Sequence, residues 1–401
     1  NKGLFSLFLI FKFIQPCLNQ KLELIQANVL WRHGDRAPLF TYDGDLVPEP
    51  EWGAPYGELT ELGMEQAYTK GLILKKRYVS DFKLISPVYN SSQVYVRSTN
   101  MDRALLSAYA VMAGIYSTEN TNSSITSIHK LPSKWTSVPV HSDNFKTDYL
   151  LNMERECSKF LAIDKQRNEN PEFQKYVRSI EPLFQLVRNN TGLPVPDVFQ
   201  LRLLEDALKI AKEKNKPLPE WITDSVYKMM DEVLNNTDDY KTGYPGFGLP
   251  IDMDMIKLRG GPLLKEMIDN MQKIINETEG SKKLKLYSGH DITVSSLMRN
   301  LNAKIQTMGQ GLPNYTAAVA IELWKSENAD FNFINMHDEN LENSEYFVQV
   351  LFSANPTDDF HPVTKFVSGC PSSSDFCPLT MFINRSKAFI PDDIIKLCND
   401  V

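Results

Sequence analysis

The residues best suited to chemistry lie in one short stretch, Arg32-His33-Gly34-Asp35-Arg36-Ala37-Pro38, where two arginines flank a histidine. A guanidinium presents a planar fork of donors that binds two phosphate oxygens at once, and neutral imidazole can attack phosphorus directly. Gly34 allows the backbone to approach a ligand closely, and Pro38 stiffens the exit from the turn. The pattern therefore indicates a phosphate site with a histidine nucleophile.

A second stretch, Tyr287-Ser288-Gly289-His290-Asp291, carries complementary groups. His290 can donate a hydrogen bond to a phosphate oxygen, and Asp291 can protonate a leaving alkoxide or phenoxide as a general acid. Arg97, elsewhere in the chain, would add a third guanidinium. Positioning and charge stabilisation supply most of the catalysis of phosphoryl transfer, and these groups are the parts it needs. The alternative interpretation is a structural ion-pair network.

Each of these groups follows a predicted β-strand. Residues 22–31 are rich in Leu, Ile and Val and precede the first motif, while shorter apolar runs at 94–96 and 284–287 precede Arg97 and the second motif. Ligands of open α/β sheets collect beyond the carboxyl ends of the strands, so we expect the three strand ends to meet at one site. Further strands are predicted over residues 317–324 and 346–352.

Helical periodicity connects these strands. Thr60 is predicted to cap a helix that runs to about Tyr78, and a capping-box-like pair of Thr99 and Asp102 is predicted to open another. The stretch 141–255 contains helical repeats and no clear strand. The predicted fold is therefore α/β, with a mixed, mostly parallel sheet flanked by helices and an inserted helical cap domain. The catalytic domain is expected over residues 21–140 and 256–401, and the cap over 141–255.

The composition narrows the class of function. The chain has 401 residues, of which 42% are hydrophobic and 23% charged, as is typical of globular proteins. Its 43 basic and 50 acidic side chains give a net charge of −7, which argues against a nucleic-acid partner. Beyond the first residues, no apolar run reaches the roughly 18 residues of a membrane span, so we do not expect one.

The N-terminus and the Asn-x-Ser/Thr sequons favour export. Lys2 precedes an uncharged run over residues 3–11, about the length of a signal-peptide core, and a signal peptide is predicted over residues 1–20. The alternative is a disordered or amphipathic tail. Seven sequons suit a secreted or lysosomal glycoprotein. They begin at Asn90, Asn122, Asn189, Asn235, Asn276, Asn314 and Asn384.

Four cysteines lie outside the predicted leader: Cys157, Cys370, Cys377 and Cys398. An even number suits two disulfides, and three connectivities are possible. The alternative is four buried thiols in a cytosolic protein. A zinc site is disfavoured, because no Cys-x₂-Cys pair occurs and His361 is the only histidine near the three C-terminal cysteines.

The ordered set of motifs resembles the histidine acid phosphatase family, within the histidine phosphatase superfamily. Arg-His-Gly-x-Arg-x-Pro at 32–38 and the distant His290-Asp291 form its signature. The order of the further matches is also similar to that of animal secreted and lysosomal acid phosphatases, over roughly residues 22–370. These matches are Val94-Tyr95-Val96-Arg97-Ser98-Thr99, Asp102-Arg103, Pro139-Val140-His141, and Leu150-Leu151 before Cys157.

The resemblance implies hydrolysis of phosphate monoesters, free or on a protein, through a phosphohistidine on His33. Asp291 would be the proton donor, and the phosphate would be bound by Arg32, Arg36, Arg97 and His290. The resemblance further implies a mechanism without metal or cofactor, an acidic pH optimum and often a homodimer.

The resemblance also bears on the cysteines and on Asp35. It implies a disulfide between Cys157 and Cys370, which leaves Cys377 to pair with Cys398. Asp35 matches the acid phosphatases at a motif position where phytases and inositol-polyphosphate phosphatases usually differ. From the residues alone, Asp35 is equally able to bond Arg36 or a backbone N–H.

Two alternatives remain open at this point. An inositol-phosphate phosphatase or phytase of the same fold would need a basic cap, and residues 141–255 contain no dense Lys/Arg cluster. A catalytically inactive exported binding or antigenic protein would be expected to have lost a catalytic residue, yet all of them are present. The other histidines of the chain are interpreted as surface or packing residues, and among them are His129, His141 and His337.

Overall fold

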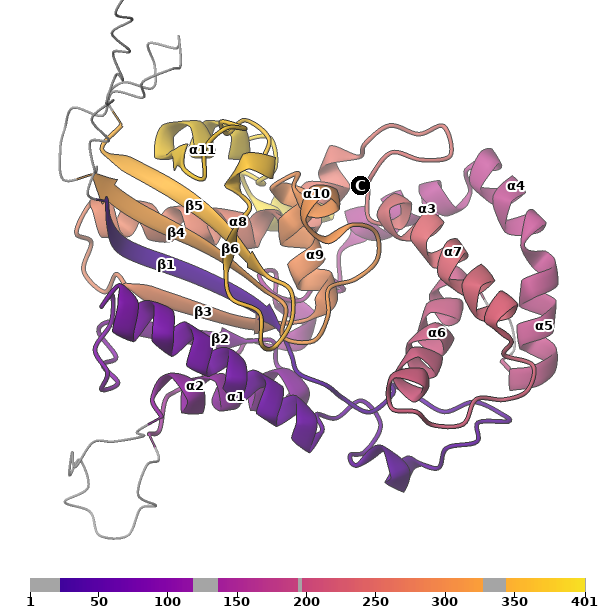
Figure 1. Cartoon of the computed structure of the whole chain (residues 1–401). Helices are drawn as coiled ribbons and strands as arrows, with labels where there is room; N and C mark the ends of the chain where they lie inside the picture. Colours follow the sequence, from indigo (N-terminus) through magenta and orange to yellow (C-terminus); the bar gives the residue numbers. More distant parts are fainter. Residues whose placement is uncertain (1–21, 118–135, 194–196, 327–343, 401) are drawn as a thin grey trace, which may run out of the picture.

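The computed structural model describes residues 22–117, 136–193, 197–326 and 344–400. The predicted leader and the residues Asn122, His129 and His337 lie outside these ranges. The described residues form a sheet of seven strands in the order β2-β3-β1-β4-β5-β6, with β7 paired to β5. Helices cover both faces of this sheet (Figure 1).

The first three strands of this order are parallel. They are β1 (Leu22–Arg32), β2 (Val94–Ser98) and β3 (Leu284–Gly289). β3 lies between the other two, with Arg32 opposite Gly289 and Ser98 opposite Ser288. Because the register aligns their carboxyl ends, the two chemical motifs start at the same edge of the sheet.

The other half of the sheet is antiparallel. β4 (Ala318–Ser326) runs opposite to β1, and β5 (Tyr346–Ser353) runs opposite to β4. The short strands β6 (His361–Pro362) and β7 (Cys377–Pro378) both pair antiparallel with β5. Among the five longer described strands, only β4 is therefore reversed. The predicted α/β class, with a mixed sheet between helices, is confirmed.

The two faces of the sheet pack into two hydrophobic cores. Val29 and Trp31 of β1 face one core, and Leu30 between them faces the other, as the two-residue period of a strand requires. Helices α1 (Glu61–Lys75) and α2 (Asp102–Ile115) cover the first face. The second face is covered mainly by α8 (Met253–Ile275) and α9 (Asp291–Asn300). Burial on both faces explains why β1 is apolar almost throughout.

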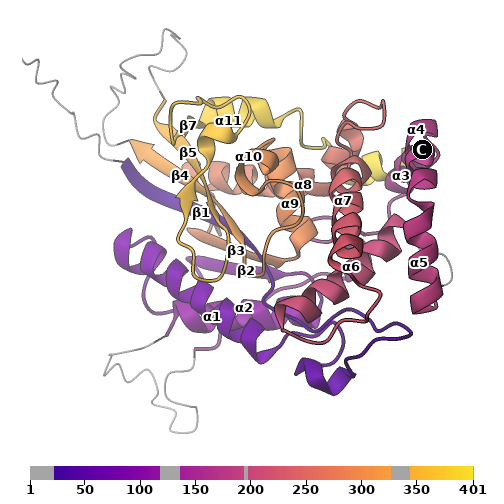
Figure 2. The same ribbon diagram turned by 45° about the vertical axis from the view of Figure 1, so that its right-hand side comes forward.

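A set of helices lies beyond the carboxyl ends of β1, β2 and β3 (Figures 1 and 2). It comprises α3 (Ser158–Asn168), α4 (Pro171–Ser179), α5 (Glu181–Thr191), α6 (Val198–Glu213) and α7 (Asp224–Lys241). Part of this set has a core of its own, built around Leu183, Leu204 and Met230. We refer to these helices as the cap helices; the predicted domain boundaries at 141 and 255 stay a prediction.

The remaining described α-helices are short. They are α10 (Lys304–Met308), α11 (Leu379–Ser386) and α12 (Ile394–Asn399). No helix in the described ranges is both long and apolar enough to cross a membrane.

Only one of the two predicted helix caps is present. The Thr60 side chain accepts a hydrogen bond from the backbone N–H of Gly63 at the start of α1, as predicted. The prediction for α2 is wrong, because the residue before its first turn is Met101, and no side chain caps it. The hydroxyl of Thr99 instead lies 2.9 Å from Nε2 of His290.

The predicted disulfide pairing is wrong. Cys157 bonds to Cys398, and Cys370 bonds to Cys377. The physical reason is the position of α12, which packs on α3 and α8 and so brings Cys398 next to Cys157 at a Cα–Cα distance of 5.0 Å. Cys370 and Cys377 are only seven residues apart and close a local turn.

Candidate active site

The backbone of the first motif is fixed by the strands on both sides of β1. The N–H of His33 donates to the carbonyl of Gly289, and the N–H of Arg32 donates to that of Ala317. A Cβ on Gly34 would lie 2.1 Å from the carbonyl oxygen of Gly63 in α1. Glycine is therefore needed at position 34 so that α1 can pack against the first motif. The sequence alone had instead led us to expect Gly34 to let the backbone approach a ligand.

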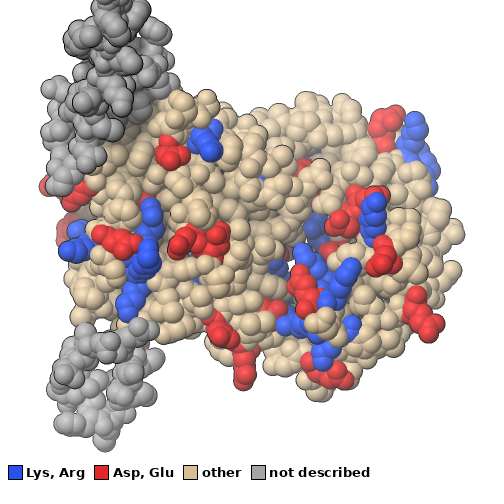
Figure 3. All heavy atoms as spheres, in the orientation of Figure 1, with Lys and Arg blue, Asp and Glu red and all other residues tan. Residues whose placement is uncertain are grey.

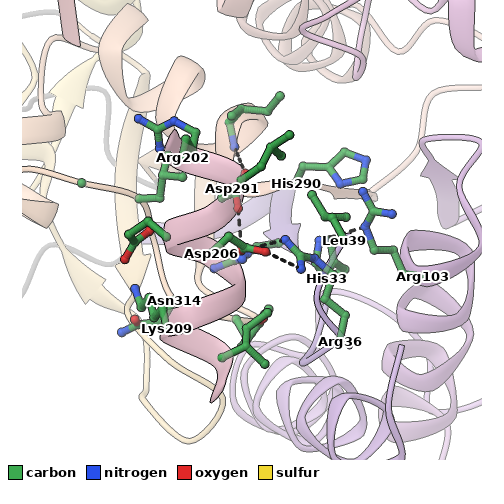
Figure 4. Close-up of a pocket in the computed structure, with 18 of the residues that line it drawn as sticks. His33, Arg36, Leu39, Arg103, Arg202, Asp206, Lys209, His290, Asp291 and Asn314 are labelled. Atoms are coloured by element: carbon green, nitrogen blue, oxygen red, sulfur yellow. Dashed lines mark hydrogen bonds and ion pairs between the residues drawn. The ribbon is translucent and has the colours of Figure 1, made fainter. Parts of the chain in front are cut away.

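A cavity of about 520 Å³ opens at this edge of the sheet. Its inner end contains Arg32, His33, Arg36, Arg103, His290 and Asp291. The opposite wall consists mainly of side chains from α6 and α7, including Arg202, Asp206 and Lys209 (Figure 4). The volume and the clustered guanidinium groups suit a small organic ligand with an anionic group.

His33 is a buried neutral imidazole. Its Nδ1 lies 2.8 Å from the carbonyl oxygen of Gly34, and since a carbonyl only accepts, we assign the proton to Nδ1. Burial lowers the pKa of His33 well below its ordinary value, and the charges of Arg32, His290 and Arg103 act in the same direction. The lone pair is therefore on Nε2, which can attack an electrophile.

Arg32 joins the two motifs. Its Nη2 forms an ion pair of 3.0 Å with Oδ2 of Asp291, its Nη1 donates to the carbonyl of Pro313, and its guanidinium lies over the ring of Tyr315. Arg36 pairs through both Nη atoms with Asp206 of α6. The Nε atoms of Arg32 and Arg36 are buried and have no hydrogen-bond partner among the described residues.

Arg97 is not brought to this cavity. Its Nη2 lies 2.6 Å from carboxylate oxygens of both Asp143 and Asp148, and it does not line the cavity. Alternation along β2 explains this position, because Val96 faces the core with α1 and α2 and Arg97 therefore faces the opposite side.

Arg103, in the first turn of α2, is the cationic residue that the sequence analysis missed. Its Nε lies 3.3 Å from Nε2 of His33 (Figure 4). Burial, with the charge of Arg36, lowers its pKa to about 10, so it stays charged at acidic and neutral pH. The sequence contained a signal for this position in the Asp102-Arg103 pair. A helix that directly follows a parallel strand begins at the carboxyl edge of the sheet, where the cavity opens.

His290 and Asp291 stand at the start of α9. The rings of His290 and His33 are 5.4 Å apart, and burial, with the charge of Arg103, lowers the pKa of His290 to about 3. Burial by itself raises the pKa of Asp291, but the charges of Arg32 and Arg36 outweigh it and hold the pKa below its ordinary value. In the unliganded site both histidines are thus neutral, and Asp291 is ionised above strongly acidic pH.

Asp35 lies beside the cavity and does not line it. Its Oδ2 accepts hydrogen bonds from the hydroxyl of Thr60 at 2.5 Å and from Nζ of Lys214 at 2.6 Å. It therefore links the first motif to the end of α6. No group of three or more His, Cys, Asp or Glu side chains in the described ranges is arranged to hold a metal ion.

A family model described as "Histidine phosphatase superfamily (branch 2)" matches residues 23–353. The chain belongs to this superfamily. Among curated proteins, it is 29% identical to prostatic acid phosphatase of Homo sapiens, over 98% of this chain and 92% of that protein. It is 28% identical to lysosomal acid phosphatase of Xenopus laevis, over 99% of this chain and 83% of that protein.

Solved structures share the histidine phosphatase fold. The phytase of Citrobacter braakii superimposes with a TM-score of 0.63 at 17% identity, covering 92% of this chain and 98% of the phytase chain. The phytase of Klebsiella sp ASR1 gives 0.61 at 17% identity, covering 94% and 99%. At this level of identity the likeness concerns the fold alone.

The sequence also singled out His141 and the sequon asparagines of this histidine phosphatase, and only some of them line the cavity. His141 stacks on Tyr95 beside β2, with ring centroids 4.9 Å apart, in agreement with the expected packing role. Two of the sequon asparagines, Asn235 and Asn314, line the cavity itself. The other four described sequon asparagines are exposed and do not line it: Asn90, Asn189, Asn276 and Asn384.

Proposed function

We propose that the protein is an acid phosphatase that hydrolyses phosphate monoesters through a covalent phosphohistidine on His33. The observation that carries this proposal is the state of His33. Its Nδ1 proton is held by the Gly34 carbonyl, and its Nε2 lone pair lies 3.3 Å from the Nε of Arg103, inside a cavity with two further arginines. Such a site offers a nucleophile next to the cations that hold its target.

In the first step, the guanidinium groups of Arg32, Arg36 and Arg103 bind the phosphoryl oxygens, and Nε2 of His33 attacks phosphorus. The N–P bond forms as the ester P–O bond breaks, and the leaving oxygen takes the carboxyl proton of Asp291. The products are phosphohistidine and the free alcohol. The Nδ1–Gly34 hydrogen bond keeps the imidazole oriented throughout.

In the second step, a water molecule attacks the phosphohistidine and gives its proton to the Asp291 carboxylate. The N–P bond breaks, inorganic phosphate is released, and His33 returns to its neutral state. His290 acts as a neutral hydrogen-bond donor in both steps. The contact of 2.9 Å between the Thr99 hydroxyl and Nε2 of His290 orients the ring.

This mechanism accounts for activity at acidic pH. The Arg32 and Arg36 charges keep Asp291 ionised in the free enzyme, so its proton has to arrive with the substrate. A phosphate monoester has its second pKa near 6 and is monoanionic below it, so it carries one proton into the site. Above about pH 6 the substrate arrives as a dianion without that proton, and turnover is expected to fall.

The solved structures with the same fold include phytases, so the phytase alternative has to be judged by the charges that the cap helices bring to the cavity. Arg202 and Lys209 are the only Lys or Arg that the described cap helices contribute to the cavity, against several carboxylates, which favours ordinary monoesters over inositol polyphosphates.

We further propose entry into the secretory pathway, supported by two disulfides, which form and persist in oxidising compartments. A homodimer remains part of this proposal through the resemblance to the acid phosphatases.

The proposal is tested by phosphate release from an aryl phosphate, a nucleotide, a phosphopeptide, a lysophospholipid and phytate, each from pH 3 to 8, with and without EDTA. We expect turnover of several monoesters with a maximum below pH 7, unchanged by EDTA. A strong preference for phytate would favour the inositol-phosphate alternative. No turnover of any ester would favour an inactive binding protein, and a loss in EDTA restored by zinc or magnesium would overturn the metal-free mechanism.

A further inference from the structure

The cavity is divided by charge. Three arginines stand around His33 at its inner end, while six of the described side chains on the remaining lining are carboxylates. These six are Glu154, Glu205, Asp206, Glu213, Asp231 and Asp238. On the face of the molecule shown in Figure 3, acidic and basic side chains gather over α6 and α7. Because Arg202 and Lys209 are the only described cations on this part of the lining, against six carboxylates, the leaving group of a bound ester extends toward a wall that is acidic on balance.

Three of these six carboxylates contribute reduced negative charge, two because of ion pairs and one because of burial. Asp206 is paired with Arg36, and Asp238 is paired with Arg202 and Arg299. Burial raises the pKa of Glu205, whose carboxylate also accepts a hydrogen bond from Tyr227. These three contribute little net negative charge at acidic pH.

The other three carboxylates have no cationic partner among the described residues. Glu154, Glu213 and Asp231 are exposed, and none of them forms an ion pair with a described cationic side chain. They come from three places along the chain: the loop before α3, the end of α6 and the middle of α7. We call these three residues the free carboxylates. Phe199, on α6, lines the same cavity with 58% of its surface exposed and offers an aromatic face to a cation.

We propose that this cavity selects phosphate monoesters whose leaving group carries a positive charge, and rejects those that carry a second anionic group. The inference rests on the proposed function and adds the substrate class to it. The phosphoryl group binds at the arginines, and an ammonium group on the leaving alcohol meets the free carboxylates and Phe199. A carboxylate or second phosphate at the same place is repelled.

The test compares O-phosphoethanolamine, whose leaving alcohol carries an ammonium group, with phosphoglycolate, whose leaving alcohol carries a carboxylate, at pH 5.5 and low salt. We expect kcat/KM to favour the cationic ester by roughly tenfold or more, since one charge pair in a partly solvated site has about that effect. The preference should shrink as ionic strength rises.

A triple variant, Glu154→Gln with Glu213→Gln and Asp231→Asn, assigns the effect to the wall. Its kcat/KM ratio between the two esters is expected to fall by roughly tenfold relative to the wild type. A matched control neutralises three exposed carboxylates outside the cavity, with Glu65→Gln, Glu279→Gln and Asp392→Asn, and is expected to keep the wild-type ratio. Dividing the ratio of one protein by that of another cancels the different leaving-group basicities.

The outcomes separate this inference from the proposed function. If p-nitrophenyl phosphate and both esters are not turned over, the proposed function fails. If p-nitrophenyl phosphate is turned over but the wild type prefers phosphoglycolate, or shows no preference, the substrate class is wrong. An unchanged ratio in the triple variant, with a thermal midpoint close to that of the wild type, would also overturn it.

Discussion

Asp206 holds Arg36 through two parallel contacts, with Nη1–Oδ2 at 2.9 Å and Nη2–Oδ1 at 3.0 Å. The pair connects a cap helix to the first motif, and it commits both Nη atoms of Arg36 to a protein carboxylate. The Nε of Arg36 has no hydrogen-bond partner among the described residues, and in the proposed function it is the donor left for a substrate oxygen. Asp206 thereby fixes the direction from which Arg36 can act, because bidentate pairing restricts a guanidinium to one plane.

Replacement of the nucleophile tests the covalent step. His33→Ala is expected to abolish turnover and to remove the acid-labile, alkali-stable phosphoryl label from enzyme quenched during turnover, because His33 is the imidazole whose Nε2 lies beside Arg103 at the inner end of the cavity. Labelling is measured with an isotopic phosphate monoester. The surface substitution His361→Ala serves as control and should retain the label. Wild-type labelling of His33→Ala would mean that another residue carries the phosphoryl group.

The importance of Asp291 should depend on the leaving group. A poor leaving group needs a proton, so Asp291→Ala is expected to slow alkyl phosphates by roughly a hundredfold or more and p-nitrophenyl phosphate much less. Because the transferred proton limits turnover at higher pH, the alkaline limb of the pH profile should flatten in the variant. Equal losses on both substrates with an unchanged limb would assign Asp291 a positioning role, and His290 would be the next candidate donor.

The two arginines near β2 are expected to respond differently. Arg103→Ala should lower kcat/KM by roughly 10²–10³, the usual effect of removing one donor from a site of developing negative charge. Arg97→Ala should leave kcat/KM much closer to wild type and instead lower the free energy of unfolding by roughly 1 to 3 kcal/mol, since it leaves the buried Asp148 with only the backbone N–H groups of Leu150 and Leu151 as partners. Urea unfolding and steady-state kinetics on both variants measure this contrast. A larger catalytic loss for Arg97→Ala would restore its predicted phosphate-binding role.

The neutral histidines should make the unliganded protein less stable in acid. The pKa of His290 is about 3 in the folded protein against 6.5 in the unfolded chain, and the pKa of His33 is lowered in the same direction. Above pH 6.5 neither state is protonated. Below it only the unfolded chain takes up protons, so stability falls as the pH drops from about 6.5 toward 3.

His290→Asn is therefore expected to remove about 1.4 kcal/mol per pH unit of this slope. Denaturant unfolding between pH 4 and 7, without phosphate, measures it, and His361→Asn controls for the loss of an imidazole as such. Equal slopes in wild type and His290→Asn would show that His290 is protonated in the folded protein.

The positions of the sequons predict which of them carry glycans. In a secretory expression host we expect glycans at the exposed Asn90 and Asn276, and none at Asn235 and Asn314, because a glycan there would fill the cavity. Enzymatic deglycosylation in heavy-oxygen water followed by mass spectrometry identifies the occupied sites. Full occupancy of Asn235 in active enzyme would mean that substrate does not enter past α7.

The parts of the site that follow from local pattern were predictable from the sequence. The apolar run of β1 ends at Arg32, and parallel pairing with β3 places His33 beside Gly289 and so near His290. Arg97 ends the same edge of the sheet but does not line the cavity, because the alternation along β2 turns it toward Asp143 and Asp148. The disulfides depend on where α12 docks, which no local pattern records. Helix α3 was missed because its sequence, SKFLAIDKQRN, is mostly polar, and only tertiary contacts stabilise it.

The bond between Cys157 and Cys398 turns the chain between them into a covalent ring that contains His290 and Asp291. His33 lies outside the ring, on the N-terminal arm, and the pairing of β1 with β3 and β4 holds it next to His290 and Asp291. A single proteolytic cut in the ring would release no fragment while the disulfide is intact. A cut in the arm after His33 would divide the molecule into one piece with the proposed nucleophile and one with the proposed proton donor.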